Sequence, residues 1–165
     1  MIDKIDSIEE LKTFLTKAYW LEVKLEQADQ WIASLKVKND ESRNVLFRIS
    51  RDSEKHKSVL KNIISNIPEF NIEKSLEELP EYIKKQDNRE KLDEEIFQDL
   101  VKNEQIAFDL YSKLNDLTDD NLIKKIWTGN NPIDYFNQIK WLIEQEREHI
   151  KLAKSLAIGN IERIM

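Results

Sequence analysis

The chain has two histidines, and the second follows a glutamate at a spacing that suits metal binding. Glu146 and His149 lie within the segment "LIEQEREHIKLAKSL", residues 142–156. On a helical wheel of about 100° per residue, Glu146 falls inside the apolar arc and His149 falls at its edge. Glu144 and Glu148 fall on the opposite side, with the lysines. Side chains three positions apart leave one helix face a turn apart, so Glu146 and His149 can reach one metal ion or two neighbouring ions.

An inward carboxylate is costly to bury unless it is paired, hydrogen-bonded or bound to a cation. For the Glu146–His149 motif alone, a hydrogen bond inside an ordinary core is the simpler interpretation. The segment "KNEQIAFDLYSKL" adds Glu104 to the buried arc of another helix. Ala107, one turn further on, leaves room for a metal ion, and Tyr111 can hydrogen-bond a carboxylate ligand.

The first predicted helix offers three acids, and their depth along the helix separates them. Glu22 lies as far before Asn39 as His56 lies after it, 17 residues in each case (39 − 22 and 56 − 39). In an antiparallel hairpin that turns near Asn39, Glu22 and His56 therefore lie at the same level. Asp29 would lie roughly 10 Å nearer the turn, and Glu26 points away from the apolar seam. Glu22 is the candidate ligand on this helix.

The second predicted helix carries His56 on its apolar face. Ser53 stands three positions before His56, where the last helix has Glu146 before His149. Asp52, four positions before His56, could supply the carboxylate that Ser53 lacks. A lone inward histidine is usually a core residue, but both histidines of this chain fall inward near the middle of long helices. We therefore predict a metal site with six candidate ligands: Glu22, Asp52, His56, Glu104, Glu146 and His149.

Apolar residues at alternating spacings of three and four predict the helices that position these side chains. The first starts at Ser7, which with Glu10 forms a capping box, and its seam runs from Leu11 through Ala28 and Ile32 to Leu35. A break near Asn39 precedes the second, which ends before Pro68.

Two further long helices are predicted in the second half of the chain. One runs from about Arg89 to Leu117, and the other starts near Pro132 and ends at Gly159, a residue suited to a C-terminal cap. The elbow between them, 118–132, is expected to hold one short helix. The segment 75–85 is expected to hold another, interrupted at Pro80.

Four long helices with short links inside each pair and one long link, 68–90, describe two helical hairpins. That connectivity predicts an all-α fold, a ferritin-like four-helix bundle with a long crossover between its second and third helices, in a single domain, 1–165. A plain helical bundle without a site is the alternative.

The composition of the chain excludes several classes of partner and of metal site. A net charge of −6, with lysines interleaved among acids, argues against a nucleic-acid partner. The N-terminus "MIDKIDSIEE" is not a signal peptide, and no apolar run is long enough for a membrane span, so we expect a soluble, cytoplasmic protein without a membrane partner. Without cysteine, only histidine and carboxylate remain as metal ligands.

Over roughly residues 7–158 the chain resembles the rubrerythrin branch of the ferritin-like superfamily. The family pattern is a Glu, a Glu-x-x-His, a second Glu with small and tyrosine followers, and a second Glu-x-x-His, one group per helix. The matching residues are Glu22, His56, Glu104, Ala107, Tyr111, Glu146 and His149. Ser53 departs from the pattern, because it stands where the family has a Glu, and this puts a symmetric, fully occupied dinuclear centre in doubt.

The resemblance implies a dinuclear centre of iron, or of iron and manganese, that reacts with peroxide or dioxygen as an oxidoreductase. Full-length rubrerythrins also carry a Cys-rich electron-relay domain, so this Cys-free chain would need an external electron donor protein. The number of subunits stays open, with a homodimer as one candidate. The alternative function is a ferritin-like binding or scaffold protein with a degenerate metal site, and Ser53 favours it.

Overall fold

The computed structural model describes residues 3–26, 39–80 and 93–164. These residues form six helices: α1 (Ile8–Glu26), α3 (Asp40–Ser65), α4 (Ile72–Glu77), α6 (Asp93–Leu117), α7 (Asp120–Ile126) and α8 (Ile133–Ile164). In the described ranges there is no β-strand, and Ile5 and Thr118 form one isolated bridge. The predicted all-α class is therefore confirmed for the part of the chain that can be seen. No helix within it is long and apolar enough to cross a membrane.

The helix starts follow local capping. The Ser7 hydroxyl accepts a hydrogen bond from the Glu10 amide at 3.2 Å, and the Asn39 side chain accepts one from the Ser42 amide at 2.9 Å. Each cap satisfies a backbone N–H that the first turn of a helix leaves free. Pro132 directly precedes α8, as predicted. The short helix expected in the elbow 118–132 is α7.

The end of α8 contradicts the sequence interpretation. Gly159 does not cap this helix, which continues to Ile164, and none of the described glycines has a positive φ. A glycine inside a helix costs only about 1 kcal/mol relative to alanine, so the residues that follow can carry the helix past it.

Other predicted boundaries can be compared only in part. The short helix of the long link, α4, begins at Ile72, earlier than expected, and ends before Pro80. The positions of Ala28, Ile32 and Leu35, and the predicted start at Arg89, lie outside the described residues.

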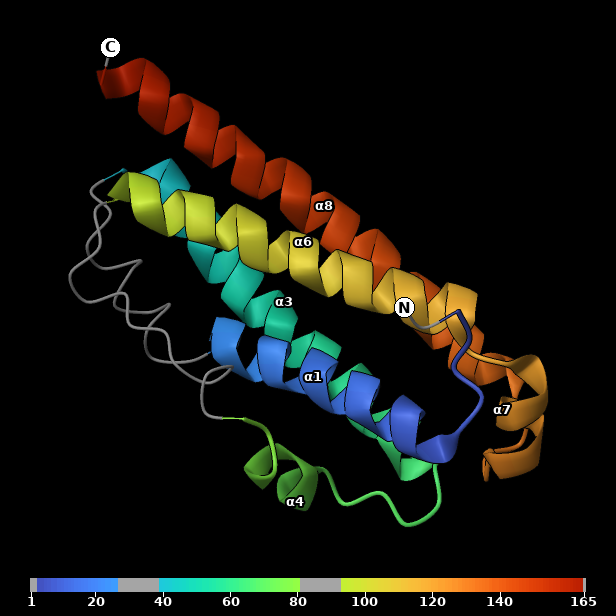
Figure 1. Ribbon diagram of the computed structural model, residues 1–165. Helices are drawn as coiled ribbons and strands as arrows, with labels where there is room; N and C mark the ends of the chain where they lie inside the picture. The colour runs from blue at the N-terminus through green and yellow to red at the C-terminus, as the bar shows by residue number, and fades with distance from the viewer. Residues whose placement is uncertain (1–2, 27–38, 81–92, 165) are drawn as a thin grey trace.

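Contacts along the four long helices fix their directions. Helix α1 runs antiparallel to α3, because Lys12 bonds the carbonyl of Glu69 while Glu22 lies against His56. It also runs antiparallel to α6, because Ile5 bonds Leu117 while Glu22 accepts a bond from Tyr111. Figure 1 shows these runs, with α7 at one end of the molecule and the C-terminus of α8 at the other.

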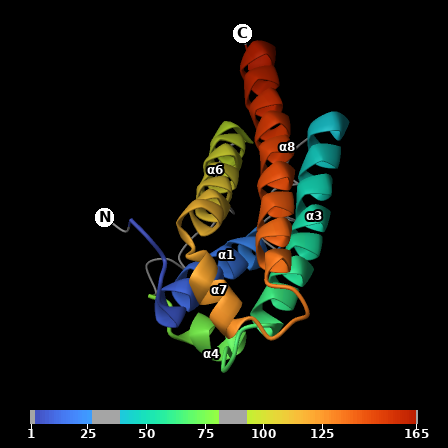
Figure 2. The ribbon, with the colours of Figure 1, turned by 90° about the vertical axis from the view of Figure 1, so that its right-hand side faces the viewer.

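Helix α8 runs antiparallel to both α3 and α6. On α3, Asn62 bonds Gln138 while Asp52 bonds His149. On α6, Thr118 lies at 2.9 Å from Tyr135 while Glu104 lies near His149. It follows that α3 and α6 run in one direction and α1 and α8 in the other. Figure 2 shows α3 and α8 side by side.

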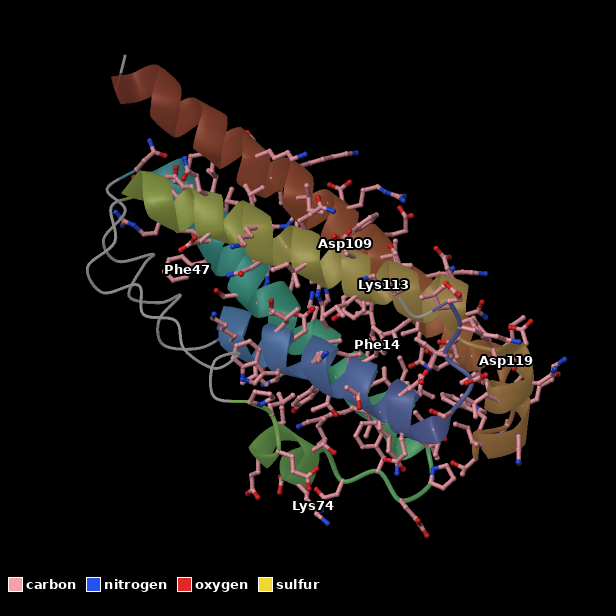
Figure 3. All side chains as sticks on the ribbon, in the orientation of Figure 1. Phe14, Phe47, Lys74, Asp109, Lys113 and Asp119 are labelled. Carbon is pink, nitrogen blue, oxygen red and sulfur yellow. The ribbon has the colours of Figure 1, made fainter. Side chains whose placement is uncertain are left out.

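Two apolar clusters fill the space between the long helices. The large apolar cluster joins all four of them and includes Leu21, Leu60, Tyr111, Leu114, Ile139 and Leu142. The small apolar cluster joins α3, α6 and α8 and consists of Leu46, Ile49, Phe97, Leu100, Ala153 and Leu156. Charged side chains such as Asp109 and Lys113 lie on the outer face of α6 (Figure 3).

A buried polar layer separates the two clusters. On α3, Asp52, Ser53 and His56 stand between Ile49 and Leu60. The same order holds on α6 and α8, where the buried polar residues stand between members of the small and the large cluster. The fold therefore places the candidate ligands in one buried layer across the molecule.

Candidate metal centre

All six predicted ligands lie in the polar layer, and five of them are almost fully buried there, with at least one from every long helix. Glu22 comes from α1, His56 from α3, Glu104 from α6, and Glu146 and His149 from α8. These five residues are 0–1% exposed. Glu144 and Glu148 are exposed on the outer side of α8, as the helical wheel predicted.

His56 connects α1 with α8. Its Nδ1 atom lies 3.2 Å from Glu22 Oε1 and 3.0 Å from Glu146 Oε1. The contact with Glu22 confirms that these two residues share one level of the hairpin. The ring of His56 stacks on that of His149 with centroids 5.2 Å apart. One ligand atom each from His56, Glu146 and His149 lie within 4.8 Å of one another, close enough to hold one cation.

His149 faces two carboxylates with one ring nitrogen and a third with the other. Nδ1 lies 3.5 Å from Glu104 Oε2 and 3.8 Å from Glu146 Oε2, and Nε2 lies 3.0 Å from Asp52 Oδ2. A carboxylate on the far nitrogen fixes the ring orientation and makes the near nitrogen a better ligand.

Asp52 differs from the other five candidates. Three cationic side chains at the surface lie near its carboxylate oxygens: Arg48 at 3.7 Å, Arg51 at 4.0 Å and Lys55 at 3.9 Å. Together with its bond to His149 Nε2, this arrangement favours a role as the hydrogen-bond partner of a ligand over the role of ligand itself.

Tyr111 supports the carboxylate of α1. Its hydroxyl donates a hydrogen bond to Glu22 Oε1 at 2.6 Å, the kind of contact that the sequence predicted for it. Burial and the nearby charges of Glu22 and Glu146 raise the pKa of Tyr111 well above its usual range, so the hydroxyl keeps its proton and remains a donor. Ala107 is buried one turn away and contributes no polar group.

The pKa values of the two central carboxylates, Glu104 and Glu146, are shifted in opposite directions. Burial, followed by the charge of Glu104, raises the pKa of Glu146 well above its usual range. Burial also acts to raise the pKa of Glu104, but Glu146 and His149, which can share protons with it, outweigh burial and lower the pKa. Like-charged carboxylates in one buried site cannot both ionise freely.

Protons therefore compensate part of the negative charge of the polar layer. Burial lowers the pKa of His149, but Glu104 and Asp52 outweigh burial and raise it to about 8. A metal ion would displace these protons, because it binds neutral imidazole and ionised carboxylate.

Many polar atoms of the layer have no hydrogen-bond partner among the described residues. They are Glu22 Oε2, Ser53 Oγ, His56 Nε2, both oxygens of Glu104, both oxygens of Glu146 and His149 Nδ1. Some of them lie in ion-pair contacts that lack hydrogen-bond geometry, such as Glu146 Oε1 at 3.0 Å from His56 Nδ1 and Glu104 Oε2 at 3.5 Å from His149 Nδ1. Buried polar atoms are nearly always satisfied, so such a concentration points to a ligand. Carboxylate and imidazole donors suit iron or manganese.

One neighbour of the site was missed from the sequence. Trp141 of α8, which is 41% exposed, places its ring edge-on to His56 with centroids 5.7 Å apart. No spacing motif links these two residues, because only the packing of α3 against α8 brings them together.

Comparisons of the chain with protein-family models, with curated proteins and with solved structures found no match. The function must therefore be inferred from the residues and their geometry.

Proposed function

We propose that this chain is a ferritin-like protein that binds iron or manganese between its four long helices and reacts there with peroxide or dioxygen. The directions of the helices support the ferritin-like part of the proposal. Helices α1 and α3 form one antiparallel pair and α6 and α8 another, and α3 runs in the same direction as α6. In a bundle of this kind, the segment between α3 and α6 is the long crossover.

The observation that carries the metal proposal is the set of unpartnered polar atoms in the buried layer. Three fully buried glutamates and two histidines converge from four helices, and an apolar cluster closes the layer on each side. Burying several ionised carboxylates together is unfavourable unless a cation compensates them. The donor set fits divalent iron or manganese.

The geometry suggests which residues would hold each metal ion. Glu22 with His56 would hold one metal position and Glu104 with His149 the other, while Glu146, which lies near both histidines, would contribute to both. A bound redox metal would supply the electron exchange with the oxidant. An external electron donor protein would return the electrons.

The surrounding side chains would prepare the ligands and keep the site dry. Asp52 holds Nε2 of His149 and so leaves Nδ1 facing the carboxylates. Tyr111 fixes one oxygen of Glu22 by its hydrogen bond. The large and small apolar clusters exclude water, which strengthens the attraction between carboxylates and cation.

Metal loading tests the proposal. Metal-free protein would be incubated with Fe²⁺ or Mn²⁺ under anaerobic conditions and then measured by elemental analysis and calorimetry. We expect tight binding that Glu146→Ala abolishes. Glu148→Ala is the matched control, since Glu148 is exposed on the same helix, and it should bind like wild type. Equally weak binding by wild type and Glu146→Ala would overturn the proposal.

The oxidant is tested separately. Iron-loaded protein would be mixed rapidly with hydrogen peroxide or with dioxygen, and the appearance of ferric absorption followed. We expect one of the two oxidants to oxidise the bound iron faster than free iron in the same buffer. If neither does, the site stores or senses a metal and does not react with an oxidant.

A second candidate function is a ferritin-like binding or scaffold protein with a degenerate site. The observation that favours it is that carboxylates already surround both histidines, since His56 lies against Glu22 and His149 against Asp52. A neutral Ser53 also removes one carboxylate from the layer. The metal-loading experiment separates the two functions, because a scaffold would show no metal binding that depends on Glu146.

A further inference from the structure

The two hairpins offer the polar layer nearly the same set of groups. Glu22 of α1 corresponds to Glu104 of α6, because each lies on the first helix of its hairpin and contacts the histidine of the second. His56 and His149 correspond in turn and stack on each other. Glu146 stands three residues before His149, but Ser53 stands three residues before His56. The hairpin of α1 and α3 therefore provides one carboxylate fewer at this point than the hairpin of α6 and α8, although Glu146 Oε1 also lies 3.0 Å from His56 Nδ1.

Ser53 is placed to face the layer. It is 0% exposed, and its Oγ atom has no hydrogen-bond partner among the described residues. Residues 52 and 53 lie on opposite sides of the direction in which His56 points, at about 40° and 60° from it. Since Asp52 occupies the side towards His149, Ser53 occupies the other side. A hydroxyl buried without a partner in a folded protein calls for a group that it can bind.

The difference between serine and glutamate at this point defines the size and charge of a group that would complete this half. A glutamate side chain extends beyond that of serine by about the three heavy atoms of a carboxylate group, which is the size of formate. Glu22, Glu104 and Glu146 provide three negative charges in the layer. Two divalent ions would leave one positive charge uncompensated, because surface cations already surround Asp52.

We propose that a small carboxylate anion, of the size of formate or acetate, binds beside Ser53 and completes the metal centre. This inference rests on the proposed metal-binding function and names a ligand of that site. The anion would take the place that Glu146 has in the other half, with the Ser53 hydroxyl donating a hydrogen bond to it. Metal-free protein should not bind it, because the layer then holds no metal ion to attract an anion.

Formate titration tests the inference. Protein loaded with cobalt(II), a metal whose visible spectrum reports its ligands, would be titrated with sodium formate and, for ionic strength, with sodium chloride. We expect saturable formate binding that changes the cobalt spectrum, and none to metal-free protein. Ser53→Ala should weaken formate binding about threefold to tenfold, since it removes one hydrogen bond. Ser53→Glu should abolish it, since its own carboxylate fills the position.

Ser58→Glu is the matched control, because it introduces the same side chain at an exposed position of the same helix. It should bind formate like wild type. Unchanged formate affinity in both Ser53 variants, or no formate binding to cobalt-loaded wild type, would overturn the inference while leaving the metal proposal intact. If Ser53→Glu does not fold, Ser53→Ala decides. Failure of wild type to bind cobalt at all would overturn the metal proposal, and this inference with it.

Discussion

Asp52 on α3 accepts a hydrogen bond across the helix interface from Nε2 of His149 on α8, at 3.0 Å. This contact joins the two hairpins at the level of the site. It also holds the opposite nitrogen, Nδ1, towards Glu104 and Glu146. The sequence suggested Asp52 as a substitute ligand beside His56, but the contact directs its effect to the half of the site that contains His149.

Asp52→Asn should therefore weaken metal binding through His149. An amide lacks the negative charge that makes His149 a stronger ligand, and loss of such a partner typically costs about tenfold to a hundredfold in affinity. Manganese titration by calorimetry would measure the change. Glu54→Gln, an exposed substitution on the same helix, should leave the affinity unchanged. Equal affinities in Asp52→Asn and wild type would show that the contact does not support a metal ligand.

The sequence predicted that Glu22 and His56 lie at the same height along their two helices, whereas it did not predict the Asp52–His149 contact. Antiparallel helices rise by the same amount per residue, so counting from Asn39 was enough to place the first pair side by side. The second pair depends on how α3 and α8 are rotated against each other, and 97 residues separate its members. A helical wheel gives the face of one helix but not its rotation against another.

Capping shows the same limit on a smaller scale. Ser7 was predicted correctly as a cap, because its hydroxyl bonds an amide three residues away. The cap at Asn39 has the same spacing but was not predicted, since the sequence showed only a break in the apolar pattern there. Gly159 was wrong because a glycine permits a helix to end without requiring it. The unpartnered Oγ of Ser53 also needed the structure, since only the packing of the layer shows which hydroxyls find a partner.

Glu146→Gln should stabilise the metal-free protein, and more so at high pH. Burial and the charge of Glu104 raise the pKa of Glu146 well above its ordinary value of 4.5. The stability that its protonated form contributes is therefore present in acid and is lost as the pH rises through the raised pKa. Glutamine does not titrate. The variant should match wild type near about pH 4 and be more stable than wild type at about pH 8.

Urea unfolding of chelator-treated protein at both pH values would measure this difference. Glu148→Gln, which changes an exposed glutamate on the same helix, should show no such pH dependence. A Glu146→Gln variant that is less stable than wild type at the higher pH would contradict the burial of an acidic layer. With metal present the order should reverse, because only wild type gains stability from binding.

Tyr111→Phe should affect both stability and the site. The substitution removes the hydroxyl that donates to Glu22 Oε1 at 2.6 Å, and the loss of a buried bond to a carboxylate costs about 1–3 kcal/mol in the free energy of unfolding. Metal affinity should fall as well, because Glu22 loses its orientation. Tyr135→Phe is the control, since Tyr135 bonds Thr118 away from the layer. It should lower stability without changing metal affinity, and equal affinities in both variants would argue against a role for Tyr111 at the site.

Ser53→Glu should make the two metal positions more alike. In wild type, α6 and α8 provide the carboxylates Glu104 and Glu146, whereas α1 and α3 provide Glu22 and, at the point equivalent to Glu146, a neutral serine. We therefore expect two metal equivalents of different affinity, the tighter on α6 and α8. A carboxylate at position 53 adds a hard oxygen ligand and one negative charge, so it should strengthen the looser equivalent. Manganese titration in formate-free buffer would resolve the two steps, with Ser58→Glu as the control for added surface charge. Two equal high-affinity equivalents in wild type, unchanged by Ser53→Glu, would show that the serine does not weaken its half of the site.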